Sequence, residues 1–159
     1  MAARNRLIAR PVEDVWAVLA DSTLYGDWVV GTSGTRPGKG TWPQLGSSIT
    51  YTVRLGRWSV TGSTVVRRCE APRTLELEAD SGRLGTARIA VEVRPWGEDS
   101  LVIIDEHPLR GPAGALHNSV AEALIQVRHR SMLARLAHVV ESAARQRESA
   151  GPRDDRAAV

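Results

Sequence analysis

The feature that most constrains the fold is a long amphipathic segment near the carboxyl end of the chain, from Asn118 to about Arg145. Apolar residues recur there at alternating steps of three and four, the spacing that places side chains on one face of an α-helix. At about 1.5 Å of rise per residue, such a helix is roughly 40 Å long. A helix of this length with one apolar side needs a broad apolar surface to cover.

Two neighbouring stripes make up the apolar side of this predicted helix. The first contains Val120, Leu124, Val127, Ser131, Ala134 and His138. The second contains Ala121, Ile125, Arg128, Met132, Leu136 and Val139. Small and polar members interrupt both stripes, so we expect incomplete packing beneath the helix and room for a ligand there.

Most of the chain before this helix has the alternating pattern of half-buried β-strands. The predicted strands are 2–9, 47–55, 58–69, 73–79, 85–96 and 101–107, with an edge strand near 31–36. Two short helices follow the first strand, because Pro11 suits a first helical position and Asp21 can cap a second helix. The expected fold is α+β: a curved antiparallel sheet of about six to seven strands that grips the long terminal helix.

Glycine, proline and tryptophan refine this expectation. The segment 29–45 is rich in glycine and proline, which predicts mainly loop around the edge strand. Trp42 lies in this segment, and we expect it to plug the core rather than gate a cavity, since a large aromatic side chain gains most from burial. Gly62, in the middle of its strand, predicts a bend or a bulge.

Size and composition limit the classes of protein that fit. A chain of 159 residues suits one domain, expected at 1–145, with a charged and disordered tail at 146–159. Lys39 is the only lysine, and the arginines are scattered, which predicts no nucleic-acid site. Cys69 is alone, so no internal disulfide can form. No apolar run has signal-peptide or membrane-span length, so we expect a cytoplasmic protein without integral membrane association.

Two stretches of the sequence resemble a known superfamily. They are IARPVEDVWAVLAD at 8–21, followed by YGDWV at 25–29, and RHRSMLARL at 128–136, followed by Glu141. The chain resembles the START-like, Bet v 1-like (SRPBCC) superfamily over about 2–144, and in particular its bacterial polyketide cyclase/dehydrase branch. The resemblance implies a helix-grip fold with a cavity between the sheet, the loops and the terminal helix. Because these are packing motifs, the resemblance leaves the chemistry open.

The implied cavity would be lined mostly by apolar side chains with a few polar groups. The candidate ligand-binding residues are Trp28, Trp42, Tyr51, Val53, Trp58, Ile89, Val91, Ile103, Leu116, Val120, Leu124 and Val127. Each of them also suits an ordinary packed core, since a strand face and a helix stripe define a side of the sheet but not a void.

Three polar residues are the catalytic candidates: Glu106, His107 and Arg128. Alternation puts Asp105 and His107 on one side of their strand and Glu106 on the other. A carboxylate near apolar surface has a raised proton affinity unless it is paired, and we expect Arg128 to be its partner. A structural ion pair between helix and sheet is favoured over catalysis.

The leading hypothesis is a protein that binds a small hydrophobic molecule, a lipid or a polyketide-like compound, without catalysis. The alternative is a cyclase, aromatase or dehydratase that uses the three polar candidates to move protons. A weaker third possibility is a module that binds a protein partner through its loops. The four histidines are scattered, so no metal site is expected, and no motif indicates a cofactor. The oligomeric state, including a homodimer, stays open.

Overall fold

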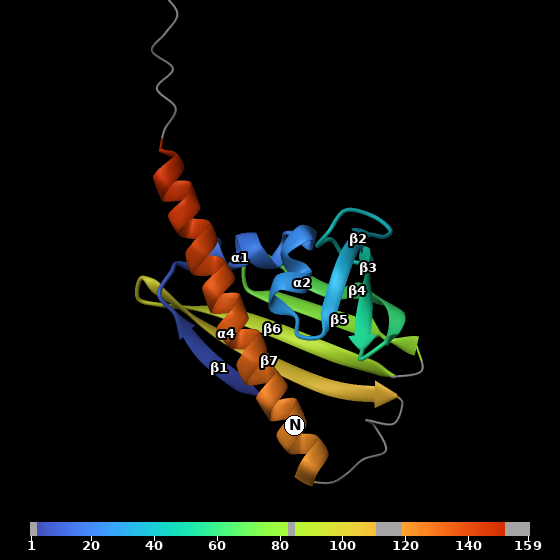
Figure 1. The fold of residues 1–159 in the computed structure, drawn as a ribbon. Helices are drawn as coiled ribbons and strands as arrows, with labels where there is room; N and C mark the ends of the chain where they lie inside the picture. Colours follow the sequence, from blue (N-terminus) through green and yellow to red (C-terminus); the bar gives the residue numbers. More distant parts are fainter. Residues whose placement is uncertain (1–2, 83–84, 111–118, 152–159) are drawn as a thin grey trace, which may run out of the picture.

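The computed structural model of the chain describes residues 3–82, 85–110 and 119–151, without the side chains of Leu55, Arg110 and residues 119–126 (Figure 1). The sheet consists of β1 (Arg4–Ile8), β2 (Thr32–Pro37), β3 (Ser48–Leu55), β4 (Trp58–Glu70), β5 (Thr74–Asp80), β6 (Thr86–Trp96) and β7 (Asp99–Arg110). The helices are α1 (Val12–Leu19), the 3-10 helix η1 (Ser22–Leu24), α2 (Tyr25–Trp28) and α4 (Ser119–Ala150).

The seven strands form one antiparallel sheet in the order β1-β7-β6-β5-β4-β3-β2. Helix α4 crosses the inner side of this curved sheet, and α1 and α2 lie beside it (Figure 1). The cap of the 3-10 helix is the predicted one, since the Asp21 carboxylate accepts from the backbone amide of Thr23 at 2.9 Å. The predicted helix-grip, α+β arrangement is therefore confirmed.

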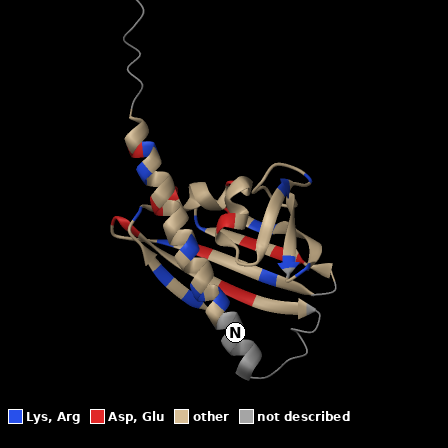
Figure 2. Cartoon of the chain, in the orientation of Figure 1, with Lys and Arg blue, Asp and Glu red and all other residues tan. Residues whose placement is uncertain are grey.

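Alternation along the strands divides the sheet into an apolar inner face and a charged outer face. Leu77 of β5 is paired with Ile89 of β6, and both side chains are buried. Burial of one such side chain contributes about 1.5–3 kcal/mol to folding. On the other face, Glu76 forms an ion pair with Arg88 at 3.5 Å. Acidic and basic residues are interspersed along these strands (Figure 2).

Helix α4 packs on the sheet through a face that includes Met132 and Leu136 of the second predicted stripe but differs from the first stripe. Its buried residues are His129, Met132, Leu133, Leu136, Ala137, Val140 and Ala144. The first predicted stripe is wrong for its described members Val127, Ala134 and His138, which are exposed. The helix is turned so that the stripe with Met132, Leu136 and Val140 faces the sheet, while Val127 faces water.

The carboxyl end of α4 continues past the predicted boundary. The tail predicted from residue 146 is helical as far as Ala150, and Arg10 holds it through an ion pair with Glu148 at 2.5 Å. This pair is exposed, so water screens the attraction between its charges. Within the ranges given above, no helix is both long and apolar enough to cross a membrane.

Candidate functional site

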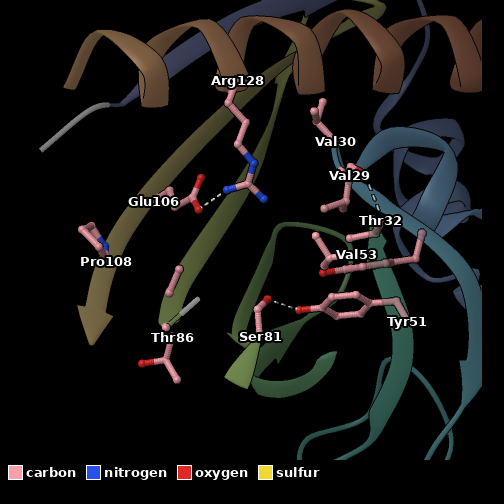
Figure 3. Close-up of a pocket in the computed structure, with 14 residues that line it drawn as sticks. Val29, Val30, Thr32, Tyr51, Val53, Ser81, Thr86, Glu106, Pro108 and Arg128 are labelled. Carbon is pink, nitrogen blue, oxygen red and sulfur yellow. Dashed lines mark hydrogen bonds and ion pairs between the residues drawn. The ribbon is translucent and has the colours of Figure 1, made fainter. Parts of the chain in front are cut away.

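A pocket of about 280 Å³ opens between α4, the segment after α2 and the ends of β3, β6 and β7 (Figure 3). Its lining is mostly apolar, with a few polar side chains. The lining residues are Tyr25, Val29, Val30, Gly31, Thr32, Tyr51, Val53, Ser81, Gly85, Thr86, Ala87, Glu106, Pro108 and Arg128. The inner face of the sheet is therefore solid under most of α4 and hollow at one end.

An aromatic cluster adjoins this pocket and contributes Tyr25 and Tyr51 to its lining. The cluster is centred on Tyr25. The ring centroids of its other members, Trp28, Trp42 and Tyr51, lie 5.6–6.0 Å from the centroid of the Tyr25 ring. Such edge and stacked pairs contribute about 0.5–1.5 kcal/mol each beyond simple burial. The hydroxyl of Tyr25 is hydrogen-bonded to Thr64 at 2.9 Å, and burial raises the pKa of Tyr25, so the phenol stays protonated at neutral pH.

Trp42 reaches the core from the loop between β2 and β3. It packs against the buried residues, and its indole nitrogen donates to the carbonyl of Leu19 at 3.1 Å. This hydrogen bond satisfies the one polar group of the ring. Trp42 is absent from the pocket lining, so it fills the role of a plug that the sequence predicted.

Gly62 makes room for the side chain of Tyr51. The two residues are paired across β3 and β4, and a Cβ atom at position 62 would lie 2.6 Å from the Tyr51 ring. The bulge that was one of the two predictions at this glycine is wrong, since β3 and β4 pair regularly through Gly62 and the register of β4 shifts only between Val66 and Arg68. The glycine instead permits a close approach of ring to backbone, and the ring forms part of the pocket wall.

Glu106 provides a carboxylate at the upper end of the pocket, close to α4. Its side chain is only 6% exposed, and each of its oxygens accepts a hydrogen bond from the helix. Arg128 donates from Nη1 to Oε1, and His129 donates from Nε2 to Oε2 at 2.9 Å. The expected pairing of Arg128 with a carboxylate of β7 is therefore present, and Figure 3 shows both side chains at the pocket.

The surroundings of Glu106 hold it in the ionised form. Burial alone raises the pKa of this carboxyl. The hydrogen bond from His129 and the positive charge of Arg128 act in the opposite direction, and together they bring the pKa of Glu106 below its usual value. A fixed negative charge thus lies beside the pocket at neutral pH.

His129 is a member of this site that the sequence prediction missed. It is fully buried, and its Nδ1 has no hydrogen-bond partner among the described residues. The sequence prediction treated His129 as one of four scattered histidines that form no metal site. A spacing of four, three and four residues leads from His129 to Leu133, Leu136 and Val140, and this pattern could have identified the face.

His107 lies on the outer face of β7, so its predicted place among the catalytic residues is wrong. Its Nε2 lies 2.9 Å from Oδ2 of Asp105, and both side chains are partly exposed. The physical reason is the alternation of a strand, which turns residues 105 and 107 away from the side that Glu106 faces.

The structure brings two of the predicted ligand-binding residues to the pocket, Tyr51 and Val53. Trp28, Ile89 and Val91 lie in the packed core. Ile103 lies on the outer face of the sheet, because it is an even number of residues from Asp105 along β7. None of these four is among the lining residues.

Trp58 and Val127 do not line the pocket either, and their predicted place in a cavity is wrong. Trp58 is 74% exposed at the tip of the β3–β4 hairpin, beyond the surface that the helices cover. Val127 is 62% exposed because α4 turns it toward water. Leu116 and the side chains of Val120 and Leu124 lie outside the described residues.

The part of the chain that the structure describes contains no group of three His, Cys, Asp or Glu side chains able to hold a metal ion. Glu106 and His129 are close together, but their third neighbour is a cation, Arg128. The site therefore offers acid, base and hydrogen-bond chemistry from its own side chains.

A family model described as polyketide cyclase / dehydrase and lipid transport matches residues 2–141. Among curated protein sequences, none matches this chain.

Several solved structures share the fold. The crystal structure of Ara h 8.0201 has a TM-score of 0.69 at 9% identity, with 88% of this chain and 96% of that chain covered. TTHA0849 from Thermus thermophilus has a TM-score of 0.65 at 16% identity, with coverage of 89% and 97%. DynU16, from the dynemicin biosynthetic locus, has a TM-score of 0.64 at 16% identity, and the match covers 89% of this chain and 47% of DynU16. At these identities, the likeness concerns the fold alone.

Proposed function

Because the chain belongs to the polyketide cyclase/dehydrase and lipid transport family, within the START-like, Bet v 1-like superfamily, we propose that it binds a small hydrophobic, polyketide-like molecule between the sheet and α4. The observation that carries this proposal is the pocket of about 280 Å³ with a mainly apolar lining and few polar groups. This is the usual composition of a small-molecule site.

The size of the pocket favours a compact ligand. Small-molecule pockets typically measure roughly 300–1,000 Å³, and this one lies just below that range. A molecule of one or two rings, or a short chain, fits this volume better than a long-chain lipid does. Of the two ligand classes that the sequence suggested, the compact polyketide-like one is therefore favoured.

Native mass spectrometry of the recombinant protein, combined with a thermal-shift screen of compact aromatic compounds, tests the proposal. A ligand at a hundred times its Kd stabilises the native state by about 2.7 kcal/mol, which raises the Tm by roughly 5–10 °C for a chain of this size. Absence of both a retained ligand and any stabilisation would count against binding.

A pair of tryptophan variants locates the binding site. Val53→Trp places a large ring in the pocket wall and should abolish the thermal shift. Thr61→Trp adds the same ring at an exposed position of β4, where alternation turns it away from the pocket, and should leave the shift unchanged. Equal loss in both variants would contradict binding in this pocket.

The second candidate function is an enzyme of the cyclase, aromatase or dehydratase kind, and one observation favours it. Glu106 and Arg128 both line the pocket, so a carboxylate base and a cationic donor lie next to the same space. A base can take a proton from an activated carbon, and a guanidinium can stabilise the enolate that forms.

Turnover of a poly-β-ketone thioester separates the two candidates. An enzyme should cyclise or dehydrate it faster than buffer does, and Glu106→Gln should remove that acceleration because an amide is a poor base. Asp105→Asn, the same change on the outer face, is the matched control and should keep the rate. A wild-type rate equal to that of buffer would leave ligand binding as the function.

A further inference from the structure

Arg128 retains hydrogen-bond donors on the pocket side. Its Nη1 donates to Glu106, while a guanidinium carries five N–H groups in all. Among the described residues, no second acceptor is bonded to this guanidinium. Figure 3 shows its other terminal nitrogen directed toward the space between Val29 and Val53. An acceptor atom of a bound molecule would meet a positioned donor there.

The charge of Arg128 is already balanced by Glu106. The Glu106 carboxylate is almost completely buried and lies directly against the guanidinium. An anion that bonded to Arg128 would lie beside this second carboxylate, where water screens the repulsion poorly. A neutral acceptor meets the same donor without that repulsion.

Among the described lining residues, the opposite end of the pocket carries no charged side chain. There the hydroxyl of Tyr51 and that of Ser81 are hydrogen-bonded at 3.3 Å, and the side chains of Val53 and Ala87 provide apolar wall. Figure 3 shows this hydroxyl pair across the pocket from Arg128. An anionic group would therefore find no cation among the described residues at this end.

We propose that the pocket selects neutral carbonyl compounds over carboxylic acids of the same carbon skeleton, with Arg128 donating a hydrogen bond to the carbonyl oxygen. This inference rests on the proposed function, because it concerns the ligand class of the same pocket. The two neighbouring side chains have separate roles: Arg128 provides the hydrogen bond, and Glu106 excludes anions.

Three probes with one naphthalene skeleton test the selection. They are 2-acetylnaphthalene, which has a neutral carbonyl, 2-naphthoic acid, which is anionic at neutral pH, and 2-ethylnaphthalene, which has no acceptor. In calorimetric titrations at pH 7.5, the ketone should bind about tenfold more tightly than the acid, since the acid meets a like charge. It should also bind about fivefold more tightly than the hydrocarbon, because of the hydrogen bond from a charged donor.

Variants assign the two roles. Arg128→Leu should reduce the affinity for the ketone to that for the hydrocarbon. Glu106→Gln removes the negative charge and should bring the acid to at least the affinity of the ketone, provided that circular dichroism shows a folded protein. Arg130→Leu, at an exposed position of α4, is the control and should leave all three affinities unchanged.

The outcomes separate this inference from the proposed function. If the wild type binds the acid as tightly as the ketone, or more tightly, the selection is wrong while ligand binding stands. If Arg128→Leu keeps the preference for the ketone over the hydrocarbon, the assigned donor is wrong. If the wild type binds none of the three probes, the result counts against the proposed function, and the inference falls with it.

Discussion

Asp105 and Glu106 are neighbours on β7, yet their carboxylates lie on opposite sides of the sheet and in different surroundings. Asp105 pairs with His107 where both side chains are partly open to water. Glu106 is buried and accepts from Arg128 and His129. The comparison shows that strand parity alone assigns one acid to the surface and its neighbour to the pocket. Substitutions of the buried carboxylate should therefore have larger effects than substitutions of the surface one.

Glu106→Leu should lower the free energy of unfolding by about 3 kcal/mol, because it leaves Arg128 and His129 facing an apolar side chain. This figure is the low end of the usual range, since Arg128 is partly exposed and can turn toward water. Urea denaturation followed by circular dichroism measures the loss. A loss below about 1 kcal/mol would show that the interactions of Glu106 with Arg128 and His129 stabilise the fold no more than a surface ion pair does.

His129→Leu should cost less, about 1–2 kcal/mol, because Glu106 loses one donor but keeps Arg128. His138→Leu, at an exposed position of the same helix, is the matched control and should change stability little. The same denaturation experiment compares the two. Equal effects would mean that the bond between His129 and Glu106 adds nothing to stability.

Acid should reduce the contribution of Glu106 to the free energy of unfolding. The pKa of Glu106 is lowered in the folded state, so its contribution to stability is fully present above its unfolded pKa, near 4.5, and is lost as the pH falls through the lowered value. Glu106→Gln lacks this ionisation. The difference in unfolding free energy between the wild type and this variant should therefore narrow between pH 7 and pH 3, and a constant difference would contradict it.

Asp105→Asn should have the smallest effect, roughly 0–1 kcal/mol, because the outer pair lies at the surface. Urea denaturation followed by circular dichroism gives the measurement. A loss as large as that of Glu106→Leu would remove the distinction between the two faces of β7.

The sequence predicted the sheet well because burial imposes a period of two on each strand. Strands β3 and β6 begin within one residue of their predicted starts, and the opposite orientation of Asp105 and Glu106 followed from alternation. The period of a helix is weaker evidence when several stripes are partly apolar. The predicted stripe containing Val127 therefore differed from the face that is buried.

The site was predictable only in part. The alternation of side chains along the strand and the opposite charges suggested that Arg128 meets a carboxylate of β7. The structure pairs Arg128 with Glu106. The burial of His129 depends on the rotation of α4 about its axis, which the pattern of residues left undetermined. The hollow itself depends on how side chains from distant strands fill the space, and alternation carries no information about that.

Gly62 has a consequence for how this pocket can be modified. The position borders no ligand space, yet its missing side chain is the reason that the Tyr51 ring can lie where it does. An alanine at position 62 would force the ring to shift, and the wall of the pocket would move with it. A substitution in β4, at a residue that does not line the pocket, should therefore change the shape of the pocket while every lining residue stays the same.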